Sequence, residues 1–517
     1  MLRGLLHETV LRTRNAPGLR SAYRGVYSAA ASCSARALGA VPGVRSVFLH
    51  RGMSREGWEP GVSDIDLVLL LESGADEPAL LAEVEGRLRW LKTALPMLGD
   101  LWLCTEEELG EYLRWGGMRA WEDAPDWARL RGRRLPAVKA LAESPEKKRW
   151  LDPWVWTFVC HMEVSRRFLR PGGEPREKLL ADMRKLLLDV ARYSDSIEGG
   201  GVEPASRADA GRRMPEVASL DAKRVWLESS ARLQRASRRT LQAVGSGSTA
   251  GLRFPAPDPG REDLLARLLE SSPGVRCAVS DPPYHTYILL GEDAAPDDYL
   301  RAAEAFLRAS AVEGVPMVLG PSAWSLCLQS SYLGAPLGWL GWRAERAGAE
   351  RIREMRQRER WGAGRDLSDQ GLFRGWGLSA LGDPGGRIRL LPERLRWEVA
   401  AEAATWMALW WRYLWIHPGY GSRFALFHLY TRALGLRLAL EGAETGPWSD
   451  WQGLLRRSRE DSDLLESLER FVREEPASFV DAAPRSCFAP EHVEALNALF
   501  GSMRENLLKG PVPCPVR

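Results

Sequence analysis

Long apolar runs, paired cysteines and an excess of charge of one sign are all missing from this sequence. No stretch reaches the roughly 18 uncharged apolar residues of a membrane-spanning helix. The nearest, 403–416 (AATWMALWWRYLWI), contains Arg412 and predicts a buried helix. None of the seven cysteines forms a C-x-x-C pair, which argues against zinc and disulfide scaffolds and favours reduced thiols in a cytoplasmic protein. The 71 basic and 68 acidic residues nearly cancel, so the charge allows a nucleic-acid partner but does not call for one.

Signals for export and for serine or cysteine nucleophiles are missing as well. The first 20 residues carry charges throughout and have no apolar centre, so they do not predict a secretory signal. There is no G-x-S-x-G motif, and no cysteine stands in a known catalytic signature. What the chain does have is length, because 517 residues exceed one hydrophobic core and predict roughly two to four domains.

The N-terminal part alternates between helical and strand patterns. Apolar residues recur at helical spacing or run continuously, and Thr105 with Glu108 forms a capping-box pattern that starts a further helix. The order predicts an α+β domain with a mixed sheet and flanking helices. Its expected elements are a helix over 18–39, strands over 44–49 and 64–71, a helix over 77–94 and a strand over 100–104.

The rest of the chain divides by composition. A second strand–helix–strand layout resembles the first, which predicts an internal duplication, although two α/β segments could share this rhythm by chance. The second layout has no acidic pair, so it cannot hold the same metals. The expected segments are an α/β domain over 1–117, a helical acceptor domain over 144–245, a linker over 246–260, a degenerate α/β unit over 261–335 and a helical domain over 340–510.

Residues 47–72 (VFLHRGMSREGWEPGVSDIDLVLLLE) hold the most informative pattern, a strand, a glycine turn and a second strand with an acidic pair. Asp64 and Asp66 are two residues apart, so both side chains are expected on the same side of the sheet. Asp100 opens the next strand. Carboxylates placed beside a glycine turn are typical of Mg²⁺ bound next to a phosphate. An isolated Asp-x-Asp is common at strand ends, so the whole pattern carries this prediction.

In these residues the chain resembles the nucleotidyltransferase superfamily (the polymerase-beta-like fold), in particular its minimal and aminoglycoside-adenylyltransferase-like branches. Gly52 opens the turn, Gly57 follows, Ser63 precedes the pair, and SDIDLVL is similar to the family's acidic strand. Where the family has Ser directly after the Gly, this chain has Met53. Either Met53 fills the serine position, or the register shifts by one residue and Ser54, the favoured candidate, takes the serine role. The resemblance implies catalytic and metal-binding roles for Asp64, Asp66 and Asp100, and nucleotide-binding roles for Gly52, Ser54 and Ser63.

The resemblance also implies a reaction. A nucleotidyltransferase would bind two Mg²⁺ ions and ATP or another NTP, and would transfer NMP to a hydroxyl group. The favoured acceptor is an aminoglycoside-like small molecule, with a protein side chain or an RNA end as alternatives. A catalytically inactive nucleotide-sensing or scaffold protein is the alternative from another class, and a protein-modifying partner in an antitoxin-like pair is a third.

Other conspicuous residues have simpler interpretations. The 22 tryptophans occur mostly at helical spacing, which favours core packing over base stacking. His161 lies in an apolar helix and is expected to be a core histidine. In the helical domain Glu163, Asp182 and Asp189 could contact an acceptor, but the sequence distinguishes none of them. The arginine-rich stretch 351–360 predicts a solvated helix face, and it is the first candidate for an RNA contact.

Overall fold

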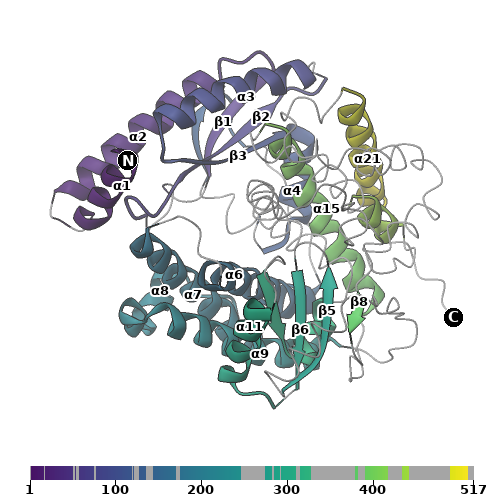
Figure 1. Cartoon of the computed structure of the whole chain (residues 1–517). Coiled ribbons are helices and arrows are strands. Elements are labelled where there is room, and N and C mark those ends of the chain that lie inside the picture. The colour runs from purple at the N-terminus through teal and green to yellow at the C-terminus, as the bar shows by residue number, and fades with distance from the viewer. Residues whose placement is uncertain are drawn as a thin grey trace, which may run out of the picture.

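The chain forms two α/β units and two groups of helices, a mixed α/β structure that is mostly helical (Figure 1). It is a computed structural model that describes residues 2–14, 16, 18–50, 53, 58–74, 77–118, 120, 127–135, 144–169, 175–245, 274–281, 285–291, 293–309, 315–327, 379–381, 391–416, 433–441 and 490–510. Among the helices in these ranges, none combines the length and the hydrophobicity that crossing a bilayer requires.

The first α/β unit contains α1 (Leu2–Thr13), α2 (Leu19–Leu38), β1 (Val44–His50), β2 (Ile65–Leu71), α3 (Glu77–Ala94), β3 (Leu98–Thr105), α4 (Glu106–Trp115) and β4 (Ala128–Arg131). The first helical group contains the π-helix η3 (Lys147–Leu151), α6 (Asp152–Leu169), α7 (Arg176–Glu198), α8 (Arg207–Arg213), the 3₁₀ helix η4 (Pro215–Ser219) and α9 (Ala222–Val244). The second half contains β5 (Val275–Asp281), β6 (His285–Leu290), α11 (Pro296–Ala309), β7 (Val315–Leu319), α12 (Pro321–Cys327), β8 (Ser379–Leu381), α15 (Glu393–Ile416) and α21 (Pro490–Lys509).

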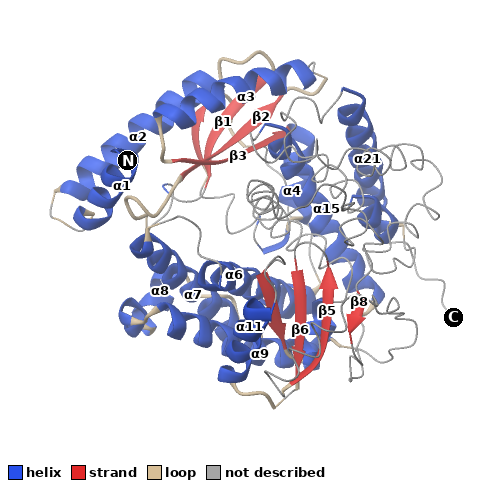
Figure 2. Cartoon of the chain, in the orientation of Figure 1, coloured by secondary structure: helices blue, strands red, loops and turns tan. Residues whose placement is uncertain are grey.

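The first sheet has the strand order β3-β2-β1-β4 (Figure 2). β1 runs antiparallel to β2 and β4, whereas β2 and β3 are parallel because α3 carries the chain back along the sheet. The expected order of helices and strands is confirmed, including the capping box, in which Thr105 Oγ1 accepts from the Glu108 amide. The sheet also continues past the expected boundary at 117. Its fourth strand, ARLR, is mostly exposed and has only 4 residues, too few for its alternation to predict a strand.

Side-chain alternation sends the two faces of this sheet into different cores. Leu67 and Leu101 join a large apolar cluster with α2 and α3. Val68 and Trp102 face the other way, into a smaller cluster that includes α4 and Leu409 of α15. Residues of α15 belong to both clusters, so neither face of the sheet is covered by the unit's own helices alone.

The second sheet repeats the topology of the first. Its order is β7-β6-β5-β8, with β5 antiparallel to β6 and β8 and with β6 parallel to β7. Even a register irregularity recurs, between Val44 and Ser46 in β1 and between Val275 and Cys277 in β5. The expected strand–helix–strand layout of this half is present. The proposed linker, 246–260, lies outside the described residues.

Each sheet packs against helices from the other half of the chain. The apolar cluster of the first sheet contains residues of α15 and α21, and the two clusters of the second sheet contain residues of α6, α7 and α9. α15 bridges the two, because its Leu395 belongs to a cluster of the second sheet and its Ala404 to that of the first. Neither sheet therefore has a complete core within its own half.

A buried charge cluster lies where the halves meet. Lys147 Nζ donates to Asp152 Oδ1 at 2.7 Å and to Glu402 Oε2 at 2.8 Å, and all three residues are buried. Gly117 has φ +67°, and a Cβ there would come within 2.8 Å of Glu402 Oε2, so this packing requires glycine. Burial raises the pKa of Glu402 to about 7, against the opposing charge of Lys147. The cluster joins η3, α6 and α15.

Candidate active site

The acidic pair lies at the amino end of β2. Asp66 follows the buried Ile65, so alternation places its side chain on the sheet face of Val68 and away from α2 and α3. Asp64 precedes the strand and lies on the same side, since both aspartates adjoin Gly99 of β3. The expectation that the two carboxylates share one side of the sheet is confirmed.

Gly99 allows this close approach. A Cβ at position 99 would overlap Asp66 Oδ1 and would come within 2.7 Å of the Asp64 Cβ. The Asp64 Cβ can move only together with its backbone, so it could not withdraw cheaply. The sequence alone gave Gly99 no role, because nothing in it reveals which backbone the carboxylates lie against.

A β-bulge brings Asp100 next to the pair. Ile65 pairs with Leu98, and Leu67 pairs with Leu101, so Gly99 and Asp100 together lie opposite Asp66 alone. The Asp100 amide donates to Asp66 Oδ1 at 2.9 Å. Bulges of this kind re-aim side chains and are common beside active sites. The structure thus gathers the three predicted carboxylates at one end of β2 and β3, although within the described ranges no three His, Cys, Asp or Glu side chains converge closely enough to hold a metal ion by themselves.

The turn before the pair is fixed by α2. The Tyr27 hydroxyl accepts from the Gly61 amide at 3.1 Å, and its ring packs edge-on against Trp58 at 5.0 Å. Ser63 is buried, and its hydroxyl accepts from the Glu59 amide at 3.2 Å. The structure therefore gives Ser63 a contact inside the turn, and its expected contact with a nucleotide stays a prediction.

Met53 packs into the core. Its side chain is 8% exposed and belongs to the apolar cluster that also holds Leu49 and Trp58. A side chain in this position anchors the turn to the sheet. Gly52 and Ser54, the residues predicted at the phosphates, lie outside the described residues.

One face of α7 carries charges toward the acidic pair. Lys178, Asp182 and Lys185 are spaced by four and three residues and so lie on the same face of the helix. The pKa of Asp64 is raised, first by the protein groups that crowd its still partly exposed carboxyl, and further by the negative charges of Asp100 and Asp182. Lys178 and Lys185 oppose this shift. The acidic pair and this face of α7 are therefore close enough to interact electrostatically.

The same face continues as an alternating charge stripe. Burial lowers the pKa of Lys185, and Arg207 lowers it further, whereas Asp182, Asp189 and Glu59 oppose the shift. Arg207 binds Asp189 through two hydrogen bonds of 2.9 and 2.5 Å. Ammonium and carboxylate groups therefore alternate along this face of α7.

The structure distinguishes the three acidic residues that the sequence left equal. Glu163 is buried and pairs with Arg166 and Arg167. Asp189 is held by Arg207. Asp182 is the one of the three whose charge reaches Asp64. The signal was available in the sequence, as charges at i, i+4 and i+7 in the helix expected over 174–198.

Three aromatic rings lie beside the acidic pair. His50 ends β1 directly opposite Asp66, and its ring lies 4.1 Å from that of Trp102 and 5.0 Å from that of Trp127. His50 is 1% exposed. These rings share the sheet face of Asp66 and give the carboxylates a rigid support.

The remaining candidates have structural roles where they are described. His161 is buried and hydrogen bonds Ser229 and Ser165, and burial lowers its pKa to about 3, which confirms the core histidine. Trp154 and Trp411 are buried as well. The arginine-rich stretch 351–360 lies outside the described residues.

Comparison of the chain with protein-family models, with curated proteins and with solved structures gives no match. Function must therefore be inferred from the chemistry of these residues.

Proposed function

We propose that this chain is a Mg²⁺-dependent nucleotidyltransferase that transfers NMP from an NTP, with ATP favoured, to a hydroxyl group. The observation that carries the proposal is the placement of Asp64 and Asp66 against Gly99, next to Asp100 on its bulge and facing the charged side of α7. The resemblance of the glycine turn and acidic strand to the nucleotidyltransferase superfamily supports the specific fold. The shared topology of the two sheets supports a second α/β unit that is a degenerate copy.

The residues fit the metal that this chemistry needs. Asp64 and Asp66 would hold Mg²⁺ through carboxylate oxygens, with Asp100 as a third ligand, and substrate phosphates and water would complete the coordination. Burial is the first cause of the raised pKa of Asp64, and the negative charges of Asp100 and Asp182 raise it further; a divalent cation would relieve this repulsion. When bound, Mg²⁺ would neutralise the triphosphate and polarise the α-phosphorus.

The chain's own residues account for the other requirements. Lys178 and Lys185 would hold the triphosphate from the side of α7, which orients the α-phosphorus toward the sheet. Asp100 would either complete the second metal site or accept the proton of the acceptor hydroxyl. The helices over 144–245 would form the acceptor wall. A small molecule is the favoured acceptor, and a protein hydroxyl or an RNA end would use the same groups.

The test is label transfer from NTPs labelled at the α-phosphate, with Mg²⁺ and with aminoglycosides, lysate protein or tRNA as acceptors. Wild type should label one acceptor class. Asp64→Asn and Asp66→Asn should each lose about 100-fold or more, since removing a group that stabilises the transition state costs several kcal/mol. Asp297→Asn, an exposed carboxylate of the second unit, is the control and should keep full activity. Transfer that persists in the Asp64 and Asp66 variants would overturn the assignment.

A nucleotide-sensing or scaffold protein without turnover is the second candidate. The buried Met53 favours it, because the position that carries serine in the related family points into the core here. Such a protein would bind nucleotide without label transfer, and Asp64→Asn would leave that binding unchanged. Equilibrium dialysis of ATP with and without Mg²⁺ separates the two candidates.

A further inference from the structure

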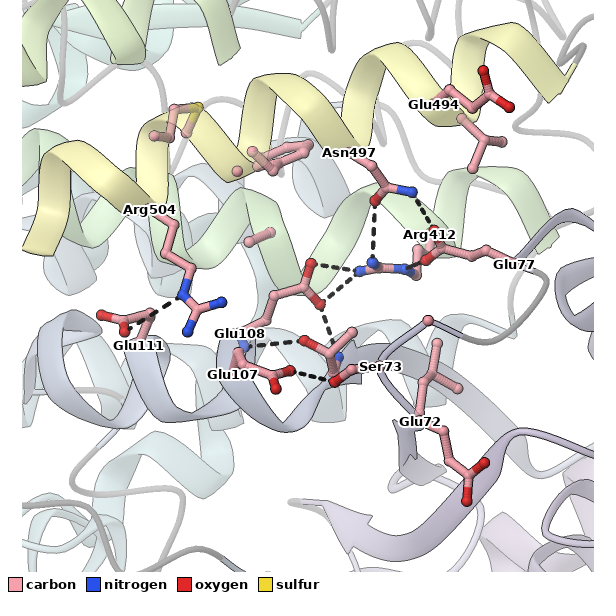
Figure 3. A pocket seen from close by; sticks show the side chains of 18 of the residues that line it. Glu72, Ser73, Glu77, Glu107, Glu108, Glu111, Arg412, Glu494, Asn497 and Arg504 are labelled. Atoms are coloured by element: carbon pink, nitrogen blue, oxygen red, sulfur yellow. Dashed lines mark hydrogen bonds and ion pairs between the residues drawn. The ribbon is translucent and has the colours of Figure 1, made fainter.

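A cavity of about 960 Å³ lies at the opposite end of the first sheet from the acidic pair (Figure 3). It opens at the carboxyl ends of β2 and β3, and its walls come from α3, α4, α15 and α21. Ligands of sheets with parallel strands commonly bind outside those carboxyl ends. The volume falls in the range of about 300–1,000 Å³ that is usual for small-molecule sites.

The charges of the cavity are mostly negative. Six glutamates and two arginines line it, so negative charges exceed positive ones by four. Arg412 is already neutralised, because it donates to Glu108 at 2.9 and 2.7 Å and also binds Glu77. Asn497 of α21 binds the same Glu77. Arg412 thus ties the walls together and leaves no charge for an anionic ligand.

Glu111 gives a second and independent indication. It is 8% exposed and lines the cavity. Arg114 and Arg504 approach only its Oε1, each at 3.9 Å, which is too far for a hydrogen bond. Its Oε2 is buried and receives no hydrogen bond from any described group. A buried carboxylate oxygen without a donor is unfavourable, and a ligand that brings an N–H donor would relieve it.

The walls also offer apolar contacts, for example Leu80, Ala408 and Phe500. Glu494 stands on the facing helix, α21, and is exposed. We infer that this cavity binds an organic cation, a small molecule with one or two protonated amines on an apolar body. An amine supplies the donor that Glu111 lacks and the charge that the glutamates favour, and the apolar body fills the space between α15 and α21. The inference is independent of nucleotidyl transfer.

Three eight-carbon probes that differ in charge test the inference by calorimetric titration. Diaminooctane should bind with saturation at one molecule per chain. Octanediol, which is neutral, should bind at least about tenfold more weakly, and suberate, the dianion, should show no binding, because Coulomb energy separates the three. Equal heats for all three probes, or no saturable heat with the diamine, would overturn the inference.

Substitutions in the cavity lining test whether the diamine binds there. Glu111→Gln and Glu494→Gln should each weaken diamine binding about five- to tenfold, through loss of one partly screened charge. Glu494 is exposed, so its replacement leaves the fold intact. Gly501→Leu should abolish binding, because a Cβ at Gly501 meets nothing within 4 Å and the added side chain would enter the space. Glu83→Gln, on the outer side of α3 where Glu83 pairs with Arg87, is the control. A loss in Glu83→Gln equal to that in Glu494→Gln would mean non-specific surface binding and would refute the site.

Discussion

At the scale of single residues, a missing side chain decides how closely the candidate carboxylates approach. Asp64 and Asp66 can both lie against β3 only because Gly99 has no Cβ. The bulge adds the Asp100 amide as a donor to Asp66 Oδ1. Glycine and bulge together position the pair.

Replacing Gly99 should disturb this arrangement without unfolding the protein. In Gly99→Ala the new methyl group would overlap Asp66 Oδ1, so the carboxylates must separate. We expect Mn²⁺-dependent ATP binding, measured by calorimetry or paramagnetic relaxation, to fall at least about tenfold, as for other disturbed ligand shells. Gly86→Ala is the matched control, because a Cβ there meets nothing within 4 Å. It should stabilise α3 by about 0.5–1 kcal/mol. Unchanged ATP binding in Gly99→Ala would contradict the proposed metal site.

The sequence predicts single residues well where chemistry and alternation coincide. The period of two places Asp64 and Asp66 on one side of the sheet, and the position of Asp100 after a helix places it on the neighbouring strand. Gly99 and Met53 could not be assigned, for a physical reason. Their roles depend on which atoms lie across the sheet and in the core, and a chain pattern alone does not contain those distances.

At the scale of elements, α7 acts on the acidic pair through several charges on one face of the helix, and not through a single residue. Its stripe places Lys178, Asp182 and Lys185 in the field of Asp64. Helices were predictable here from period and breaks, and so were most strands. The short edge strands β4 and β8 were not, because three or four residues carry no periodic signal.

Removing one positive charge from this face should weaken nucleotide binding even when no metal is present. In Lys178→Gln the pKa of Asp64 should rise further, since Lys178 lowers it in the wild type. We expect ATP affinity in EDTA to fall about five- to tenfold at low salt, and less at high salt because the interaction is electrostatic. Lys223→Gln, an exposed lysine at the start of α9, should change neither quantity. Equal losses in the two variants would show that α7 has no special contact with nucleotide.

At the scale of the whole molecule, the halves are joined by buried charge. Lys147 lies between Asp152 and Glu402, so one ammonium faces two carboxylates away from water. Glu398, one turn earlier on α15, accepts a hydrogen bond from Ser144 at 2.6 Å on the same side. Such a cluster is favourable only while its charges are balanced. No sequence pattern links residues so far apart, which is why this junction could not be predicted.

The stability that this buried charge cluster contributes should depend on pH. Burial raises the pKa of Glu402 from 4.5 to about 7, so the folded protein keeps a proton there that the unfolded chain has already released. The stability from this proton is complete below about pH 4.5 and is lost as pH rises to about 7. Glu402→Gln mimics the protonated form. In urea unfolding, we expect its free energy of unfolding relative to wild type to increase by about 2–3 kcal/mol as the pH rises from 5 to 8.

Two outcomes bear on this interpretation of the junction. Lys147→Met leaves both carboxylates without their cation, and it should destabilise the protein by about 3–5 kcal/mol at pH 8. A difference between wild type and Glu402→Gln that stays constant from pH 5 to pH 8 would show that Glu402 does not hold the proton.

The exchange of helices between the halves has a consequence for biosynthesis. The first sheet leaves the ribosome early, but Glu77 binds Asn497, which is 420 residues later in the chain, and Glu108 binds Arg412, which is 304 residues later. Contacts this distant form slowly, because a long loop must close before they contribute. The nascent chain therefore carries the first sheet with part of its apolar surface uncovered until α15 and α21 have been made. A protein built in this way completes its first sheet unit only after α21 has been synthesised, and it needs protection from aggregation until α21 docks.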